Sequence, residues 1–188
     1  MSRYIFLFNL DSTITKQEIL PTIAKEVGIY DELEKLQEIP GHGELPFKKS
    51  FLNKVDLLKG IPVSTVNTIV REIALNEKLL GFIRANRDRC YVVTGYLDVW
   101  IEGLLSRMGI GGNVFCSKAL VKDGYIEDVF SVVDKHAVTS QMVVPFVAVG
   151  DGNNDAEMME AAEVGIGYGG VSEIAPAVLE CATHLIYN

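Results

Sequence analysis

The sequence predicts an α/β protein: a Rossmann-like, doubly wound parallel sheet with a small helical cap inserted after its first strand. Short apolar runs alternate along the chain with segments of helical periodicity, which is typical of a parallel sheet covered by helices on both faces. The first runs each end at a cluster of polar residues. With 188 residues, 48% of them hydrophobic, the chain can bury a core of this kind.

Four apolar runs are the candidate core strands, and a fifth is a candidate edge strand. They are Tyr4–Asn9, Cys90–Thr94, Phe146–Gly150 and Val164–Ile166, with His184–Tyr187 at the edge. Ligands of open α/β sheets bind outside the carboxyl ends of the strands. We therefore expect Asn9, Thr94 and Asp151 to meet at one rim of the sheet.

The stretch between the first strand and Cys90 is too long for a simple crossover and contains no convincing strand. It holds two apolar helical stripes, Ile19 to Val27 and Val66 to Ile73, separated by a loop at Pro40-Gly41-His42-Gly43. We interpret residues 15–87 as a helical cap, and residues 1–14 and 88–188 as the α/β core. Further along, Lys122-Asp123-Gly124 lies between two apolar runs and predicts a β-hairpin.

Composition and charge limit the partners and the compartment. A formal net charge of −8 and a pI near 4.9 argue against nucleic-acid binding through a general basic surface, so an anionic small substrate would need a local cationic pocket. Cys90, Cys116 and Cys181 lack CxxC spacing and fit buried free thiols in a reducing compartment. The apolar run from Tyr4 to Leu10 is too short for a signal peptide or a membrane span. We expect a cytoplasmic protein that binds no membrane.

The run Gly150-Asp151-Gly152-Asn153-Asn154-Asp155 carries the strongest chemical signal. It joins an apolar strand to a helical segment, and its two carboxylates stand four residues apart. Carboxylates at such a turn, with a glycine that permits close approach, suit a hard divalent cation that keeps several waters. The alternative is an acidic turn that only caps the following helix.

A second polar run, Phe8-Asn9-Leu10-Asp11-Ser12-Thr13, follows the first strand and resembles the DxDST motif of the haloacid-dehalogenase superfamily. Every feature of that motif is present except its first aspartate, which is replaced by Asn9. Thr94-Gly95, Lys135 and the GDGNND run resemble the remaining motifs of the family, in the expected order and over nearly the whole chain. The finer resemblance is to the phosphoserine-phosphatase-like subgroup.

The resemblance implies a catalytic role for each matching residue. Position 9 would carry the nucleophile that forms an aspartyl-phosphate, and Asp11 would be the general acid and base. Thr94-Gly95 would hold phosphoryl oxygens. Lys135 would neutralise the phosphoryl group, with Lys118 as the competing candidate.

The resemblance also implies Mg²⁺ as cofactor. The ion would bridge residue 9, the phosphate, the backbone carbonyl of Asp11 and the carboxylate of Asp151. Asp155 would orient water bound to the metal, and Asn154 of the same loop would contact the substrate.

The cap contributes the residues that are expected to select the substrate. Glu18 stands where phosphoserine phosphatases place the glutamate that receives the substrate ammonium, and Leu45-Pro46-Phe47 resembles the segment before their substrate-binding helix. The alternatives are a solvated acid at Glu18 and a core residue at Phe47. Lys54 replaces an arginine that binds the substrate carboxylate, so selectivity should be looser. Tyr96 and Gly41 also depart from the subgroup.

Asn9 limits the reaction that this chain can carry out by the family's mechanism. A neutral amide cannot attack phosphorus, so turnover should fall by several orders of magnitude, at about 1.4 kcal/mol of barrier per tenfold. The sequence indicates a Mg²⁺-dependent phosphomonoester hydrolase in a disabled form, monomeric or homodimeric, acting on phosphoserine or a similar small phosphorylated metabolite. The alternatives are a natural pseudo-phosphatase that only binds its ligand, and a phosphotransferase. Both a natural asparagine and one introduced to trap a substrate complex would give this sequence.

Overall fold

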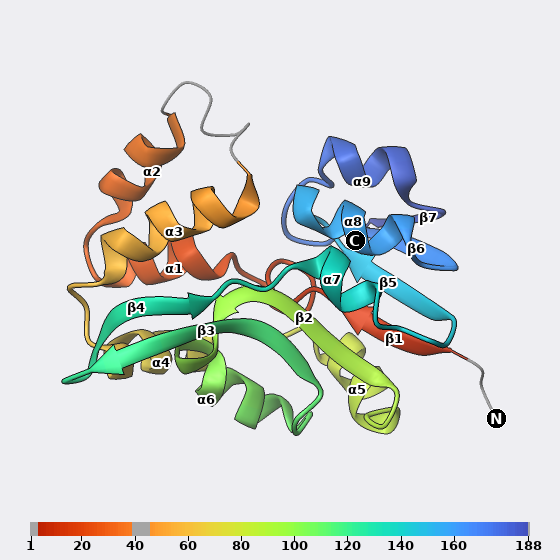
Figure 1. The fold of residues 1–188 in the computed structure, drawn as a ribbon, viewed down its shortest axis with the longest axis horizontal. Coiled ribbons are helices and arrows are strands. Elements are labelled where there is room, and N and C mark those ends of the chain that lie inside the picture. Colours follow the sequence, from red (N-terminus) through yellow and green to blue (C-terminus); the bar gives the residue numbers. More distant parts are fainter. Residues whose placement is uncertain (1–3, 39–45, 188) are drawn as a thin grey trace.

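The computed structural model describes residues 4–38 and 46–187 and shows a twisted sheet between layers of helices (Figure 1). Within these residues the sheet has seven strands, in the order β4-β3-β2-β1-β5-β6-β7. Every neighbouring pair is parallel except β3 and β4. The strands are β1 (Ile5–Phe8), β2 (Cys90–Leu97), β3 (Val114–Lys122), β4 (Tyr125–Ser131), β5 (Phe146–Gly150), β6 (Val164–Gly169) and β7 (His184–Tyr187). The predicted α/β fold class is confirmed.

Alternate residues of the central strands pack into two different apolar clusters, one on each face of the sheet. Phe8 and Val92 belong to one buried apolar cluster, whereas their neighbours Leu7 and Val93 belong to another. Successive side chains of a strand point to opposite faces, so β1 and β2 are buried on both sides. This is why the predicted strands are nearly continuous apolar runs.

The predicted hairpin is confirmed at its turn, although its strands are longer than the sequence indicated. Asp123 and Gly124 have φ values of 52° and 85°, the left-handed conformation that a two-residue hairpin turn requires. The first part of β3 pairs with β2, and the second part pairs with β4. The turn also contacts the stretch predicted as a cap, because the backbone N–H of Val63 donates to the Gly124 carbonyl at 2.9 Å.

Helices cover both faces of the sheet. In Figure 1, α4, α5 and α6 lie below the strands, whereas α1, α2 and α3 lie above them on the left and α7, α8 and α9 lie above them on the right. The helices are α1 (Ile19–Glu26), α2 (Tyr30–Glu38), α3 (Phe47–Leu58), α4 (Val63–Glu72), α5 (Glu77–Ala85), α6 (Asp98–Met108), α7 (Lys135–Thr139), α8 (Ala156–Glu160) and α9 (Pro176–Cys181), with a short 3-10 helix, η2 (Asn153–Asp155).

The two apolar stripes predicted for the insert fall on α1 and α4. Ile23 and Val70 are fully buried and belong to the same cluster as Phe8 of the sheet, so the insert shares a core with the strands. α5 packs on the sheet itself, with the ring of Phe82 edge-on to Phe6 at 5.0 Å. The division of the chain into a core and a cap at residues 14 and 88 stays a prediction. The loop predicted at residues 40–43 lies outside the described residues.

The three cysteines are free thiols, as the sequence predicts. Cys90 is buried in β2, Cys116 and Cys181 are partly buried, and all three are free thiols. Burial raises the pKa of the Cys90 thiol to about 11, so this thiol stays protonated near neutral pH. Among the helices of the described ranges, none combines the length and the apolar character needed to cross a membrane.

Candidate active site

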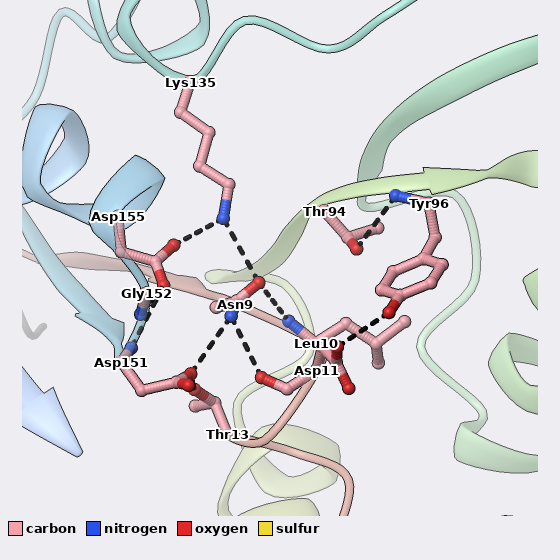
Figure 2. Close-up of polar contacts among 10 residues, drawn as sticks. All are labelled: Asn9, Leu10, Asp11, Thr13, Thr94, Tyr96, Lys135, Asp151, Gly152 and Asp155. Carbon is pink, nitrogen blue, oxygen red and sulfur yellow. Dashed lines mark hydrogen bonds and ion pairs between the residues drawn. The ribbon is translucent and has the colours of Figure 1, made fainter. Parts of the chain in front are cut away.

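The polar residues predicted at the rim do meet there (Figure 2). Asn9 directly follows β1, Asp151 directly follows the neighbouring strand β5, and Thr94 lies within β2 on the other side of β1. All three side chains are buried. The backbone N–H of Asn9 donates to the carbonyl of Val149 at 2.8 Å, which fixes the two strand ends side by side.

The side-chain amide of Asn9 lies at the centre of the site and makes four hydrogen bonds (Figure 2). Its Oδ1 accepts from the backbone N–H of Leu10 at 2.9 Å and from Lys135 Nζ at 3.1 Å. Its Nδ2 donates to the Asp11 carbonyl at 3.0 Å and to Asp151 Oδ1 at 3.2 Å. Rotating the amide by half a turn would set donors against donors and acceptors against acceptors. The four partners therefore define its orientation.

The carboxylate of Asp151 faces this amide from the end of β5. Its Oδ1 also accepts from the Thr13 hydroxyl at 2.9 Å. Burial, and then the negative charge of Asp155, raise the pKa of Asp151 to about 7, although the bonds from Thr13 and Asn9 act in the opposite direction. The site thus holds a carboxylate whose charge is poorly compensated by its neighbours.

Lys135 and Asp155 form a buried ion pair beside Asn9. The other oxygen of Asp155 accepts from the backbone N–H groups of Asp151 and Gly152, at 3.0 and 2.9 Å. A side chain at position 150 would overlap the Asp155 carboxylate, so the strand must end in a glycine there. Asp155 therefore acts on the loop and on Lys135, and it does not contact Asn9.

The structure brings Lys135, and not Lys118, to the rim. The side chain of Lys135 is 3% exposed and reaches Asn9 from the start of α7. Lys118 is exposed and pairs with Asp98 at 3.4 Å, in a surface pocket that none of the rim residues lines. Of the two lysines considered from the sequence, only Lys135 has the required position.

Asp11 presents different groups to different neighbours. Its backbone carbonyl faces Asn9, whereas its carboxylate accepts from the Ile19 N–H at 2.8 Å and from the Tyr96 hydroxyl at 2.7 Å. Burial raises the pKa of Asp11 to about 6. Burial and the nearby Asp11 charge raise the pKa of Tyr96 well above its usual value, so the phenol stays protonated and donates. No pattern in the sequence predicted this contact.

A cavity of about 180 Å³ lies above the rim, and residues of α1 and α3 form the wall opposite the rim. It is lined by Asn9, Asp11, Leu20, Phe47, Ser50, Phe51, Lys54, Thr94, Gly95, Tyr96, Asp151, Gly152 and Asn154. Four residues predicted for phosphate or substrate, Phe47, Lys54, Gly95 and Asn154, are among them. Burial lowers the pKa of Lys54, and the charges of Asp11 and Glu18 oppose that shift.

Phe47 and Glu18 occupy contrasting places relative to this cavity. The ring of Phe47 lies so close to Gly95 that a side chain at position 95 would overlap it. Glu18 is exposed, accepts from the Ser172 hydroxyl at 3.1 Å, and lines a neighbouring surface pocket instead. Leu45 and Gly41, also considered from the sequence, lie outside the described residues.

Of the three predicted Mg²⁺ ligands, two suit the ion and the third does not. The Asp11 carbonyl and the Asp151 carboxylate are oxygens of the kind that hard cations prefer. Asn9 directs N–H groups at both of them, so its amide lies where a cation would bind. In the parts of the chain that the structure describes, no cluster of three or more His, Cys, Asp or Glu side chains could hold a metal. Two ligands fit the ion, and Asn9 in this orientation does not.

The fold defines an α/β protein with a Rossmann-like sheet, and its buried polar side chains gather where the parallel strands end. The chain belongs to the haloacid dehalogenase-like hydrolase family, whose model matches residues 6–160. The family resemblance carried by the four sequence motifs is therefore confirmed.

The sequence of this chain is similar to those of known phosphoserine phosphatases. It is 30% identical over 182 residues to a phosphoserine phosphatase of Archaeoglobus fulgidus, covering 87% of this chain and 52% of that protein. It is 29% identical over 179 residues to the phosphoserine phosphatase of Methanocaldococcus jannaschii, covering 87% of this chain and 84% of that protein. The chain thus spans about half the length of the first relative and most of the second.

Solved phosphoserine phosphatase structures are similar over their whole fold. A phospho-aspartyl intermediate analogue superposes with a TM-score of 0.79 at 25% identity, covering 99% of this chain and 94% of that one. A substrate-bound complex superposes with a TM-score of 0.78 at 26% identity, covering 99% and 93%. The resemblance to the phosphoserine-phosphatase-like subgroup is confirmed by both comparisons.

Proposed function

We propose that this protein is a phosphomonoester hydrolase of the phosphoserine phosphatase type, disabled in its present form by Asn9. The observation that carries the proposal is the buried cluster of Asn9, Lys135 and Asp151 beneath a small cavity. Each of these residues matches a motif that the family resemblance assigns to the reacting end of the site. The two relatives described above are both phosphoserine phosphatases, which supports the same reaction.

The hydrogen bonds of Asn9 indicate how an aspartate would sit in its place. One carboxylate oxygen would replace Oδ1 and be held by Lys135 and the Leu10 N–H. The other oxygen would replace Nδ2 and face the Asp11 carbonyl and Asp151, so three oxygen ligands would converge. That set would hold Mg²⁺, which supplies positive charge against the phosphoryl oxygens. In the reaction proposed for that form, Asp11 is the acid and base, and Thr94 and Gly95 bind the phosphoryl group.

The cavity supports a small anionic substrate. Its volume of about 180 Å³ leaves room for a compact metabolite, Lys54 is part of its wall, and Asn9, another residue of the wall, accepts a hydrogen bond from Lys135. Lys54, on the insert, is the group that would meet a second anionic group such as a carboxylate. Phosphoserine or a similar phosphorylated metabolite has these features.

A second candidate function is a pseudo-phosphatase that binds a phosphorylated ligand and does not hydrolyse it. One observation favours it: the Asn9 amide has all four of its hydrogen bonds, so the site is internally satisfied without a carboxylate at position 9.

The test is phosphate release by the Asn9→Asp protein from phosphoserine and a panel of small phosphorylated metabolites, with Mg²⁺ and with a chelator. Chelator-sensitive release by the variant alone supports the hydrolase, and the panel ranks its substrates. If neither form releases phosphate from any compound, the pseudo-phosphatase becomes the better account.

Magnesium affinity should also change with Asn9. The Asn9→Asp protein is expected to bind Mg²⁺ roughly 10- to 100-fold more tightly than the unchanged chain, because an oxygen anion replaces two N–H donors between the remaining ligands. Isothermal titration calorimetry measures both affinities. Asn153→Asp adds the same charge to the loop that carries Asp151, on an exposed side chain, and it should leave the affinity nearly unchanged.

Glu18 is proposed to receive the ammonium group of the substrate from just outside the cavity. In the Asn9→Asp background, Glu18→Gln should raise KM for phosphoserine about two- to fivefold, as an exposed charge pair would. KM for a simple phosphate ester should not change. Glu34→Gln, in the same surface pocket, is the matched control. Equal effects of Glu18→Gln on both substrates would remove Glu18 from the substrate site.

A further inference from the structure

The hydroxyl of Tyr96 lies at a junction between the rim and the insert. It donates to Asp11 Oδ2 at 2.7 Å and accepts from the backbone N–H of Leu20 at 3.3 Å. Tyr96 is itself 8% exposed, at the end of β2, and its ring and hydroxyl point from that strand toward Asp11 (Figure 2). Its one proton is thus committed to the Asp11 carboxylate.

The other oxygen of Asp11 is held by the same helix that Tyr96 contacts. Asp11 Oδ1 accepts from the N–H of Ile19 at 2.8 Å, and Ile19 and Leu20 are the first two residues of α1. N–H groups in the first turn of a helix have no partner within the helix. Glu18, at the N-cap position, makes no capping bond with its side chain. Asp11 and Tyr96 together supply the acceptors that this helix start needs.

Aromatic packing fixes where the hydroxyl can be. The Tyr96 ring meets Phe51 of α3 edge-on, with centroids 6.4 Å apart, and Phe51 stacks on Phe47 at 5.7 Å. The ring is therefore held by its own strand on one side and by α3 on the other. Because the ring cannot swing freely, its hydroxyl offers Asp11 a hydrogen bond in one direction only.

We propose that Tyr96 is a positioning residue: its hydroxyl holds the Asp11 carboxylate in place and, through Leu20, ties the start of α1 to the rim. The proposal rests on the proposed function, in which Asp11 is the acid and base. Tyr96 is one of the positions at which this chain departs from the subgroup that it resembles.

The first test uses the chain as it is. Tyr96→Phe removes the hydroxyl and keeps the ring, and Tyr91→Phe is the matched control, since Tyr91 lies on the same strand and packs against Phe115 in the other apolar cluster. Amide hydrogen exchange, followed by NMR, should accelerate about tenfold at Leu20 and at Ile19 in Tyr96→Phe. Ile19 is the informative amide, because its acceptor is Asp11 and not Tyr96. The amide of Val27, bonded to Ile23 at the far end of α1, should not change.

The second test measures turnover in the Asn9→Asp background. Adding Tyr96→Phe should lower kcat about tenfold and leave KM unchanged, because a hydrogen bond to a charged group is lost without loss of substrate contacts. Adding Tyr91→Phe should change neither. A kcat that Tyr96→Phe leaves unchanged, or an Ile19 amide that exchanges at its original rate, would overturn the proposal. If Asn9→Asp releases no phosphate, the proposed function fails, and the exchange of Ile19 and Leu20 alone decides whether Tyr96 holds Asp11.

Discussion

Changing Asn9 to aspartate is expected to raise phosphate release from a suitable small phosphate ester by several orders of magnitude, at about 1.4 kcal/mol of barrier per tenfold. The amide oxygen of Asn9 is a poor nucleophile, and both hydrogen-bond donors that reach it reduce its electron density further. A carboxylate in the same position keeps those donors, which would orient it, and carries the negative charge that attack on phosphorus needs. Steady-state phosphate release at matched protein concentration measures the gain.

The control for this gain is Asn153→Asp, which makes the same chemical change two residues from Asp151 on an exposed side chain. It should give no release above that of the unchanged chain. Comparable gains from the two variants would trace the activity to added negative charge near the rim and would remove position 9 from the nucleophile role.

Replacing Lys135 by methionine is expected to lower the free energy of unfolding by about 3–5 kcal/mol, the cost of leaving one member of a buried ion pair without its partner. Asp155 is 0% exposed, and its Oδ1 would lose the ammonium group that neutralises it. Oδ2 would keep only the two backbone N–H groups of the loop. Urea unfolding of the two proteins measures the difference.

Lys118→Met is the matched control for that experiment, because it removes a lysine from an exposed pair with Asp98. Its effect should be at most about 1 kcal/mol. If the two lysine variants were equally stable, the ion pair of Lys135 with Asp155 would not stabilise the loop that contains Asp151 and Asp155.

The residues at the rim could be predicted from the sequence because their positions follow from strand ends. A parallel sheet brings the carboxyl ends of its strands together whatever the details of packing, so Asn9, Thr94 and Asp151 had to meet. The position of Lys135 was harder to predict, because a single lysine has no periodicity. Its place in the order of the motifs was the only signal, and it was sufficient to prefer Lys135 to Lys118.

The contacts between the insert and the rim could not be predicted in the same way. The bond from Leu20 to Tyr96 joins residues 76 apart in the chain, and the bond from Ser172 to Glu18 joins residues 154 apart. Such contacts depend on how the helices of the insert are rotated over the sheet, which no local pattern specifies. The first part of β3 was missed for a related reason: its pairing with β2 is set by register, and its apolar residues are only partly buried.

The contact between Phe47 and Gly95 leaves only a glycine hydrogen between the aromatic ring and the backbone of β2. Phe47 and Gly95 both line the cavity above the rim. A methyl group at position 95 would overlap the end of the ring, so the ring, and with it one wall of the cavity, would have to shift. The space available to a ligand is thus limited by a residue that has no side chain.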